Sequence, residues 1–277
     1  MKELLKDLKP YQLTAEAHKH RTRPHLNSGQ LFKKSVEETD LKSFPNVFVG
    51  IPKDIPSASD PLWANVTFGA VNTAEKSACV VFISKIILNE YGYNSISVLN
   101  LLNEAAQKGY RSWTLSNKRK TLTAPVATID VFKKAFPDDE YIQSCTTLKE
   151  IYDKYGRPEG IGGSMFFIDN IIKLLSNDEN LRIGNDTRIQ SIQQLLDNLK
   201  SGIMVPVRVE NSIYHDTPFR TGGHYVVLVG FINQYALVVD TSFENGINIV
   251  PAKRFVNAIV GNHDDLICAW NLKPCCR

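Results

Sequence analysis

Three residues of the chain have the types needed for thiol chemistry: Cys79, His224 and Asp240. A cysteine attacks a carbonyl carbon as a thiolate, so it needs a base that takes its proton. The base in turn needs a group that fixes its tautomer and stabilises its cation. A sulfur, an imidazole and a carboxylate supply these three parts. We therefore interpret Cys79, His224 and Asp240 as a catalytic triad; the alternative for His224 is a hydrogen-bonded core histidine.

The stretch 77–88 is predicted to be a central helix that carries Cys79 in its first turn. Its apolar residues recur at helical spacing and also cover the remaining faces, which is typical of a helix buried all round. Ser77 is the expected N-cap and Gly92 the expected stop. At a helix N-terminus, unpaired N–H groups and the macrodipole stabilise a thiolate. The alternative interpretation of Cys79 is a small buried hydrophobe.

The stretches 222–231 and 235–240 are predicted to form an antiparallel hairpin with a turn near 232–234. His224 opens the first strand and Asp240 closes the second, so we expect them to be direct or diagonal cross-strand neighbours. Gly222 and Gly223 would leave room for a substrate backbone.

Two further histidines rank below His224. His215 lies upstream of the hairpin, where it can flank the cleft, and His263 is expected in a solvated turn. Trp63 stands in an irregular, polar approach to the central helix and is a further candidate for the substrate cleft.

The composition of the 277-residue chain is that of an ordinary globular protein, with a net charge of only +3. This charge is too mild to indicate a nucleic-acid partner. No run approaches the roughly 18 apolar residues of a membrane span, so we expect no membrane association. The N-terminus has no apolar signal-peptide region, which predicts a cytoplasmic protein or one exported without a recognisable signal. The sequence does not indicate an oligomeric state.

Neither a metal nor a cofactor is expected. The five cysteines show no Cys-x-x-Cys or Cys/His ligand spacing, and their scatter suits a reducing compartment. His18, His20 and His25 are interleaved with lysine and arginine, so we interpret them as part of a solvated basic arm rather than as metal ligands. The glycine-rich stretch 156–163 has no lysine in P-loop fashion and is predicted to be a loop at the edge of a cleft.

The chain is predicted to consist of an N-terminal extension, 1–61, and one catalytic domain, 62–277. Proline and glycine punctuate the extension, although 44–50 can add a short strand to the domain. Caps and apolar periodicity predict the remaining elements of the domain. They are helices at 97–108, 147–154, 164–175, 189–199 and 252–260, and strands at 203–209, 247–250 and 266–272.

Residues 63–272 resemble a papain-like cysteine peptidase, closest to the branch of double-glycine leader peptidases. The resemblance is carried by the Cys79 helix, by the helix–Gly–strand unit 189–209, and by Gly-Gly-His-Tyr-Val-Val-Leu-Val-Gly-Phe followed by Val-Val-Asp. It implies an α+β fold in which a helical half with the central cysteine helix packs on a twisted antiparallel sheet. It also implies a triad of Cys79, His224 and Asp240 that cleaves peptide bonds of a peptide or protein substrate.

Two departures from the family pattern bear on activity. Relatives usually have Cys-Gly-Pro where this chain has Cys79 followed by two valines. Relatives also place a glutamine of the oxyanion hole six residues before the cysteine, where Thr73 stands here, with Asn72 as the alternative donor. The open alternatives are therefore a thiol acyltransferase or deamidase on the same fold, and a catalytically inactive relative that binds a peptide or protein partner.

Overall fold

The structure is a computed structural model that describes residues 26–56, 75–108, 112–115, 120–122, 128–156, 158–161, 165–178, 188–218, 222–243, 245–260 and 269–272. The described chain is α+β. Its contacts divide it into two compact units. The first unit is Met1–Thr22, Ser57–Lys85 and Tyr93–Phe167, and the second unit is Arg23–Pro56, Ile86–Gly92 and Ile168–Arg277.

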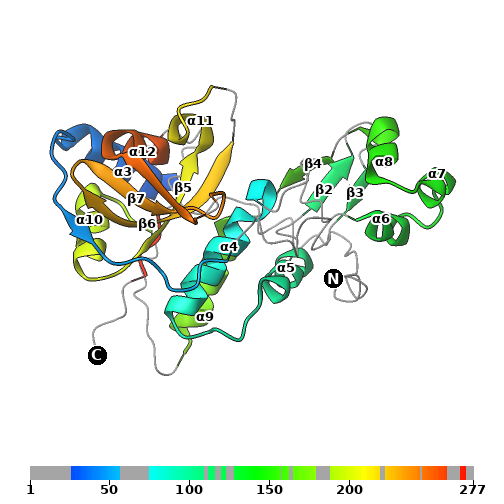
Figure 1. Ribbon diagram of the computed structural model, residues 1–277, viewed down its shortest axis with the longest axis horizontal. Helices are drawn as coiled ribbons and strands as arrows, with labels where there is room; N and C mark the ends of the chain where they lie inside the picture. The colour runs from blue at the N-terminus through cyan, green and yellow to red at the C-terminus, as the bar shows by residue number, and fades with distance from the viewer. Residues whose placement is uncertain are drawn as a thin grey trace. The chain divides into compact units, whose positions relative to one another are not determined.

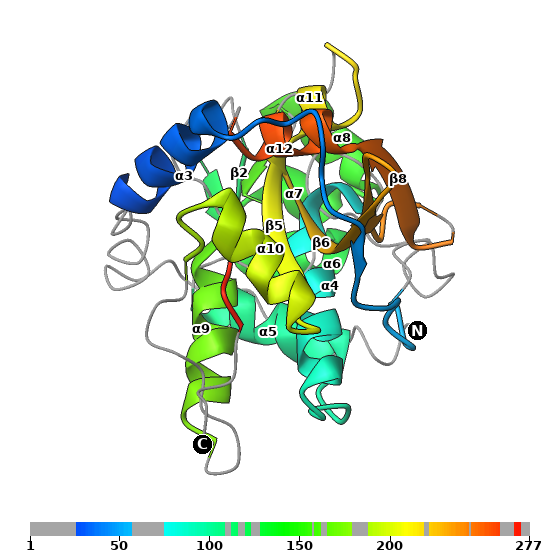
Figure 2. The ribbon, with the colours of Figure 1, turned by 90° about the vertical axis from the view of Figure 1, so that its left-hand side faces the viewer.

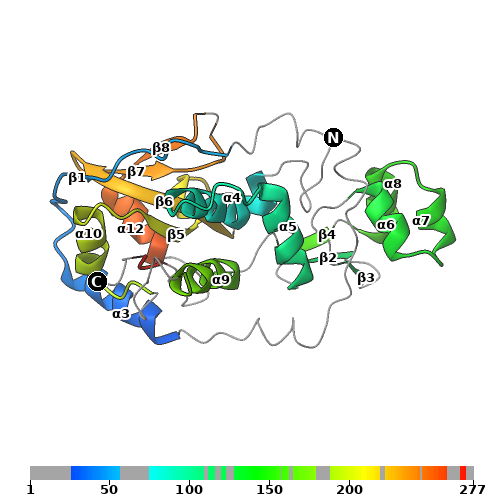
Figure 3. The ribbon, with the colours of Figure 1, turned by 90° about the horizontal axis from the view of Figure 1, so that it is seen from below.

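The second unit is built on a five-stranded antiparallel sheet (Figures 1 and 3). Its central strand, β6, pairs with β7 along one edge. Along its other edge it pairs first with β5, through 223–228, and then with β1, through 230–231. The sheet is completed by β8, which pairs with β7. The strands are β1 (Val47–Phe48), β5 (Val205–Glu210), β6 (Gly223–Ile232), β7 (Tyr235–Val239) and β8 (Ile247–Pro251).

The hairpin predicted from the sequence is confirmed in β6 and β7. Two residues, Asn233 and Gln234, connect the strands, and both have positive φ angles, 49° and 68°. Positive φ at both central residues matches the right-handed twist of a two-residue hairpin. The Asn46 side chain accepts a hydrogen bond from the Asn233 N–H at 2.8 Å. The Gln234 side chain accepts one from the Phe44 N–H at 3.2 Å, so the turn is tied to the chain around β1.

Three amphipathic helices cover one face of this sheet: α3 (Leu26–Glu38), α10 (Ile192–Lys200) and α12 (Ala252–Val260) (Figure 2). Their apolar faces share one core with alternate residues of the strands, such as Val226, Leu228 and Val238. The predicted helix 189–199 begins later, at Ile192, because the Ser191 side chain caps it by accepting from the Gln194 N–H.

Residues 26–56 belong to the second unit and differ from the predicted N-terminal extension. Phe32, Val36 and Phe44 are buried in its core, and Phe44 stacks on Phe231 with 4.6 Å between ring centroids. The short strand expected within 44–50 is present as β1. The proline and glycine residues of this segment therefore do not mark it as an unpacked extension. The helix α3 forms despite Gly29, and its apolar stripe is buried. Residues 1–25 and 57–61 lie outside the described part of the chain.

The first unit holds a three-stranded antiparallel sheet in the order β3–β2–β4. Its strands are β2 (Ser112–Leu115), β3 (Lys120–Leu122) and β4 (Pro158–Ile161). The sequence did not predict this sheet: β4 lies in the glycine-rich stretch expected to be a loop. Its pairing partner β2 lies some 45 residues away, so no local pattern reveals it.

The first unit also holds α5 (Val98–Gln107) and three short helices, α6 (Ile129–Ala135), α7 (Glu140–Ser144) and α8 (Leu148–Tyr155) (Figure 1). The helices predicted at 97–108 and 147–154 are confirmed as α5 and α8, and each begins with a capping box. The short helices α6–α8 enclose a small core that contains Phe132, Ile142 and Cys145. The Tyr155 hydroxyl bonds the carboxylate of Asp139, which caps α7.

Two helices run from the first unit into the second. The predicted central helix is confirmed as α4 (Glu75–Glu90), whose residues from Ala78 to Leu88 are buried apart from Cys79 and Lys85. It ends before Gly92, which has a φ of +84°. The predicted helix 164–175 is confirmed as α9 (Met165–Ser176), whose inward face includes Ile168 and Ile171.

Candidate active site

The hairpin brings His224 and Asp240 together, as predicted. His224 is the second residue of β6, and Asp240 directly follows β7. The imidazole Nε2 lies 2.8 Å from the Asp240 Oδ1, and both residues are buried. Val239 pairs with Val227 across the hairpin, so Asp240 and His224 are diagonal rather than directly opposite neighbours. We call these two residues the dyad.

The Asp240 carboxylate is held on both oxygens. Its Oδ1 accepts hydrogen bonds from the Ser242 N–H at 3.0 Å and the Ser242 hydroxyl at 2.6 Å, in addition to the contact with His224. Its Oδ2 accepts a hydrogen bond from the Tyr214 hydroxyl at 2.9 Å. The side-chain amide of Asn248 donates in turn to the Tyr214 hydroxyl at 3.0 Å. These hydrogen bonds fix the orientation of the carboxylate.

The electrostatics of the dyad favour an ionised Asp240. Burial acts to raise the pKa of this carboxyl, but the positive charge of His224 and the hydrogen bonds from His224 and Ser242 outweigh burial, so the pKa lies well below its usual range. Burial and the negative charge of Asp240 raise the pKa of Tyr214 well above its usual value, so its hydroxyl stays protonated as a donor. A buried carboxylate in this position stabilises an imidazolium cation.

Sequence reasoning missed Tyr214, Ser242 and Asn248. Ser242 had a detectable signal, because Asp-x-Ser after a strand is the pattern of an aspartate that accepts from the N–H two residues on. Tyr214 ends α11 (Asn211–Tyr214), a four-residue helix 26 residues before Asp240 in the chain. Only the tertiary fold brings it to the carboxylate, so no local pattern could have revealed it.

His215 lies beside the dyad, and its expected place at a substrate cleft stays a prediction. Its ring centroid lies 6.2 Å from that of His224 and 6.1 Å from that of Phe243. It directly follows α11 and is half-buried. His263, the other histidine weighed, lies outside the described residues.

The two glycines before His224 differ in what surrounds them. Gly222 has a φ of +95°, and a side chain there would meet open space. At Gly223 the space beside the backbone is occupied by the Arg208 guanidinium, which a Cβ would overlap. Gly223 therefore accommodates an arginine of β5, and the expected approach of a substrate backbone to the two glycines stays a prediction.

Glu210, at the end of β5, organises the chain that enters β6. It is buried, and its carboxylate accepts from the Gly222 N–H at 3.1 Å and from the Ser212 hydroxyl at 3.4 Å. The Asn211 N–H donates to the Gly222 carbonyl at 2.9 Å. These contacts fix the backbone immediately before His224.

Cys79 is half-buried on α4, in the first unit, whereas the dyad belongs to the second unit. The helix begins at Glu75, two residues before the predicted N-cap Ser77, so Cys79 is its fifth residue. The first four N–H groups of a helix are the ones without intrahelical partners, so Cys79 lies just past the first turn in which it was expected. The approach of Cys79 to His224 stays a prediction.

The remaining predicted site residues lie outside the described part of the chain. These are the oxyanion-hole candidates Asn72 and Thr73 and the cleft candidate Trp63. The same holds for His18, His20 and His25. Within the described residues, no group of three or more His, Cys, Asp or Glu side chains is arranged to hold a metal ion. None of the described helices is both long and apolar enough to cross a membrane.

Comparison of the chain with protein-family models, with curated proteins and with solved structures found no match. The papain-like assignment consequently stays a prediction, and the antiparallel sheet with its buried dyad is what the structure adds to it.

Proposed function

We propose that this protein is a thiol hydrolase of the papain-like type that cleaves peptide bonds through an acyl-enzyme on Cys79. The observation that carries the proposal is the buried contact between His224 and Asp240, whose second carboxylate oxygen is fixed by Tyr214. A structural histidine does not require an ionised partner, whereas an imidazole backed by an oriented, ionised carboxylate suits a base that becomes a cation during the reaction.

The reaction has two steps. His224 takes the proton of the Cys79 thiol, and the sulfur attacks the substrate carbonyl carbon to form a tetrahedral oxyanion. This intermediate expels the amine, which leaves with the proton from His224, and an acyl thioester remains. Water, deprotonated by His224, then attacks the thioester and releases the acid and the thiol. Because Nε2 contacts Asp240, we assign the proton exchange to Nδ1 of His224.

Selective alkylation of Cys79 tests the proposal. Wild-type protein is treated with iodoacetamide near pH 6, and the modified cysteines are identified by peptide mass spectrometry. We expect modification of Cys79 before the other four thiols, and loss of that preference in His224→Ala. Cys145 is an internal reference, because burial raises the pKa of its thiol. His215→Ala is the matched control, since it removes a neighbouring imidazole that the mechanism does not use.

Substrate profiling completes the test. A peptide library is digested with wild-type protein and with Cys79→Ser, and we expect cleavage by the wild type alone. Alkylation of all accessible thiols at equal rates, with no cleavage by either protein, contradicts the proposal.

The position of Cys79 favours one second candidate, a catalytically inactive relative that binds a peptide or protein. A cysteine at the fifth residue of α4 has less help from the helix N-terminus in ionising than one in the first turn. Transfer of the acyl group to an amine, or deamidation, uses the same residues and is distinguished by the products of the profiling experiment.

A further inference from the structure

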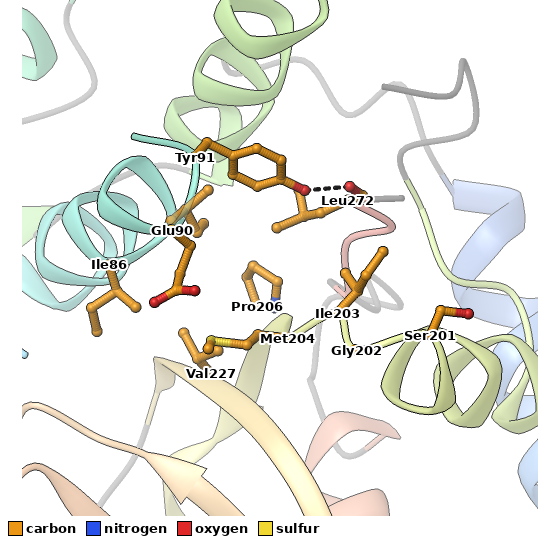
Figure 4. Close-up of a pocket in the computed structure, with 11 residues that line it drawn as sticks. Ile86, Glu90, Tyr91, Ser201, Gly202, Ile203, Met204, Pro206, Val227 and Leu272 are labelled. Atoms are coloured by element: carbon orange, nitrogen blue, oxygen red, sulfur yellow. Dashed lines mark hydrogen bonds between the residues drawn. The ribbon is translucent and has the colours of Figure 1, made fainter. Parts of the chain in front are cut away.

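A pocket of about 490 Å³ lies within the second unit, between the end of α4 and the chain that enters β5 (Figure 4). Its volume is within the roughly 300–1,000 Å³ of small-molecule sites. It is also about three times the ~150 Å³ cavity that suffices to bind benzene. The pocket is lined by Ile86, Ile87, Glu90, Tyr91, Ser201, Gly202, Ile203, Met204, Pro206, Val227 and Leu272.

The walls of the pocket are mainly apolar, and two of its polar side chains are already engaged. The Tyr91 hydroxyl donates to the Leu272 carbonyl, which joins two sides of the pocket (Figure 4). The Ser201 hydroxyl donates to the Asp197 carbonyl at 2.7 Å. A ligand in the pocket therefore contacts mainly apolar side chains, apart from one further polar side chain.

Glu90 is this further polar side chain. Its carboxylate points into the space between Ile86 and Pro206 (Figure 4). Among the residues that the structure describes, none forms a hydrogen bond or an ion pair with this carboxylate. Desolvation by its surroundings raises the pKa of Glu90, while the positive charge of Lys53 acts in the opposite direction. Among the described residues that line the pocket, Glu90 is the one charged side chain.

We propose that this pocket binds a small apolar molecule that carries an amine, with the apolar body against Ile86, Met204 and Val227 and the ammonium group on Glu90. An ammonium group would offer the carboxylate a charge-assisted hydrogen bond, which is stronger than one between neutral groups. An anionic ligand of the same size would meet the negative charge of Glu90, and none of the other described lining residues carries a positive charge. Neither His224 nor Asp240 lines the pocket, so the proposed binding does not use the residues of the proposed hydrolase activity.

Displacement of a neutral fluorescent probe tests the proposal. N-phenyl-1-naphthylamine is bound to the full-length protein at pH 7 and then displaced by n-octylamine, 1-octanol or octanoate, which share one alkyl chain. We expect octylamine to displace the probe at roughly ten-fold lower concentration than octanoate, with octanol between them. Equal potency of octylamine and octanoate overturns the proposal, and so does a wild-type protein that does not bind the probe.

Three variants locate the site. Glu90 is an exposed residue, so Glu90→Gln should weaken octylamine about three- to five-fold, as expected for an exposed ion pair, and leave octanol unchanged. Met204→Trp fills the pocket at a half-buried position and should abolish probe binding. Glu37→Gln removes an exposed carboxylate elsewhere in the second unit and should change nothing. An unchanged octylamine affinity in Glu90→Gln contradicts the proposal. This test does not depend on Met204→Trp, whose folding is checked by its circular dichroism spectrum.

Discussion

Asp240 is fully buried, yet hydrogen bonds from Tyr214 and from the backbone and side chain of Ser242 satisfy its carboxylate beside the contact with His224. Burying a charge is costly unless it is paired and fully bonded, so each of these partners supports the ionised state of Asp240. The geometry of the dyad thus depends on three further residues, Tyr214, Ser242 and Asn248. Asn248 is included because its side chain donates to the Tyr214 hydroxyl.

At the scale of single residues, replacing Tyr214 by phenylalanine tests this network. The variant leaves Oδ2 of Asp240 without its donor while the aromatic ring stays buried. We expect a loss of about 1–3 kcal/mol in the free energy of unfolding, measured in urea, because the lost hydrogen bond is to a charged group. Tyr235→Phe is the matched control: Tyr235 is exposed, and the change should stay within about 0.5 kcal/mol. Equal effects of the two substitutions would show that the Tyr214 hydroxyl does not support the dyad.

Replacing Asp240 by asparagine gives a prediction about pH. The pKa of Asp240 is lower in the folded protein than its ordinary value of 3.8, so its contribution to stability is fully present above that value. That contribution is lost as the pH falls toward the folded-state pKa. We expect Asp240→Asn to lower the free energy of unfolding by about 3–5 kcal/mol at pH 7, because it leaves His224 without its charged partner. The difference from wild type should shrink below about pH 4.

The control for this pH dependence is Asp216→Asn. Asp216 forms an ion pair with Arg254 at 3.1 Å, but its side chain is largely exposed. Such pairs contribute little, so the unfolding curves of this variant should follow wild type at both pH values. A loss for Asp240→Asn that stays constant between pH 7 and pH 3 would contradict the assignment of an ionised, stabilising carboxylate.

At the scale of elements, the attachment of β1 to β6 depends on Gly230. A Cβ at this position would overlap the Val47 carbonyl oxygen and approach the Cα of Phe48 to 2.9 Å. We expect Gly230→Ala to push β1 away from the sheet, to destabilise the protein by about 1–3 kcal/mol, and to speed amide hydrogen exchange at Phe48 and Val49. The Val49 amide is informative because it donates to the Val229 carbonyl at 2.9 Å.

Gly202→Ala separates this local effect from general destabilisation. Gly202 has a φ of +76° and open space around it, so an alanine there strains the backbone without touching β1. It should lower stability while amide exchange at Val49 keeps its wild-type rank relative to the amides of β6. Similar exchange at Val49 in the two variants would rule out a specific role of Gly230 in seating β1.

The elements also show how far sequence reasoning reaches. The β6–β7 hairpin, α4 and α12 follow from patterns within one segment, namely continuous apolar residues, turn residues and caps. Because the hairpin is local, the pairing of His224 with Asp240 could be predicted with it. The strand β4 and the role of Tyr214 depend on partners distant in sequence. The helix α3 was not predicted because it contains Gly29. Sequence reasoning therefore missed the features that depend on tertiary contacts.

At the scale of the whole molecule, the chain does not divide into units in the order of its sequence. Each unit is assembled from three separate segments, and α4 and α9 each contribute to both. The proposed nucleophile and the dyad therefore come from different units although α4 enters the second unit at Ile86. Any truncation at the predicted boundary 61/62 would remove α3 and β1 from the second unit.

The packing of α3 gives the prediction at this scale. Phe32 is 0 % exposed and belongs to the core formed with α10 and α12, whereas its neighbour Leu31 is 48 % exposed on the same helix. We expect Phe32→Ala to lower the free energy of unfolding by about 3–5 kcal/mol, through lost burial and the cavity left behind. Leu31→Ala should change it by less than about 0.5 kcal/mol. If residues 26–56 were instead an extension outside the core, the two substitutions would have equally small effects in urea denaturation. A large loss of unfolding free energy in Phe32→Ala but not in Leu31→Ala would show that residues 26–56 fold as part of the second unit, which contains the dyad.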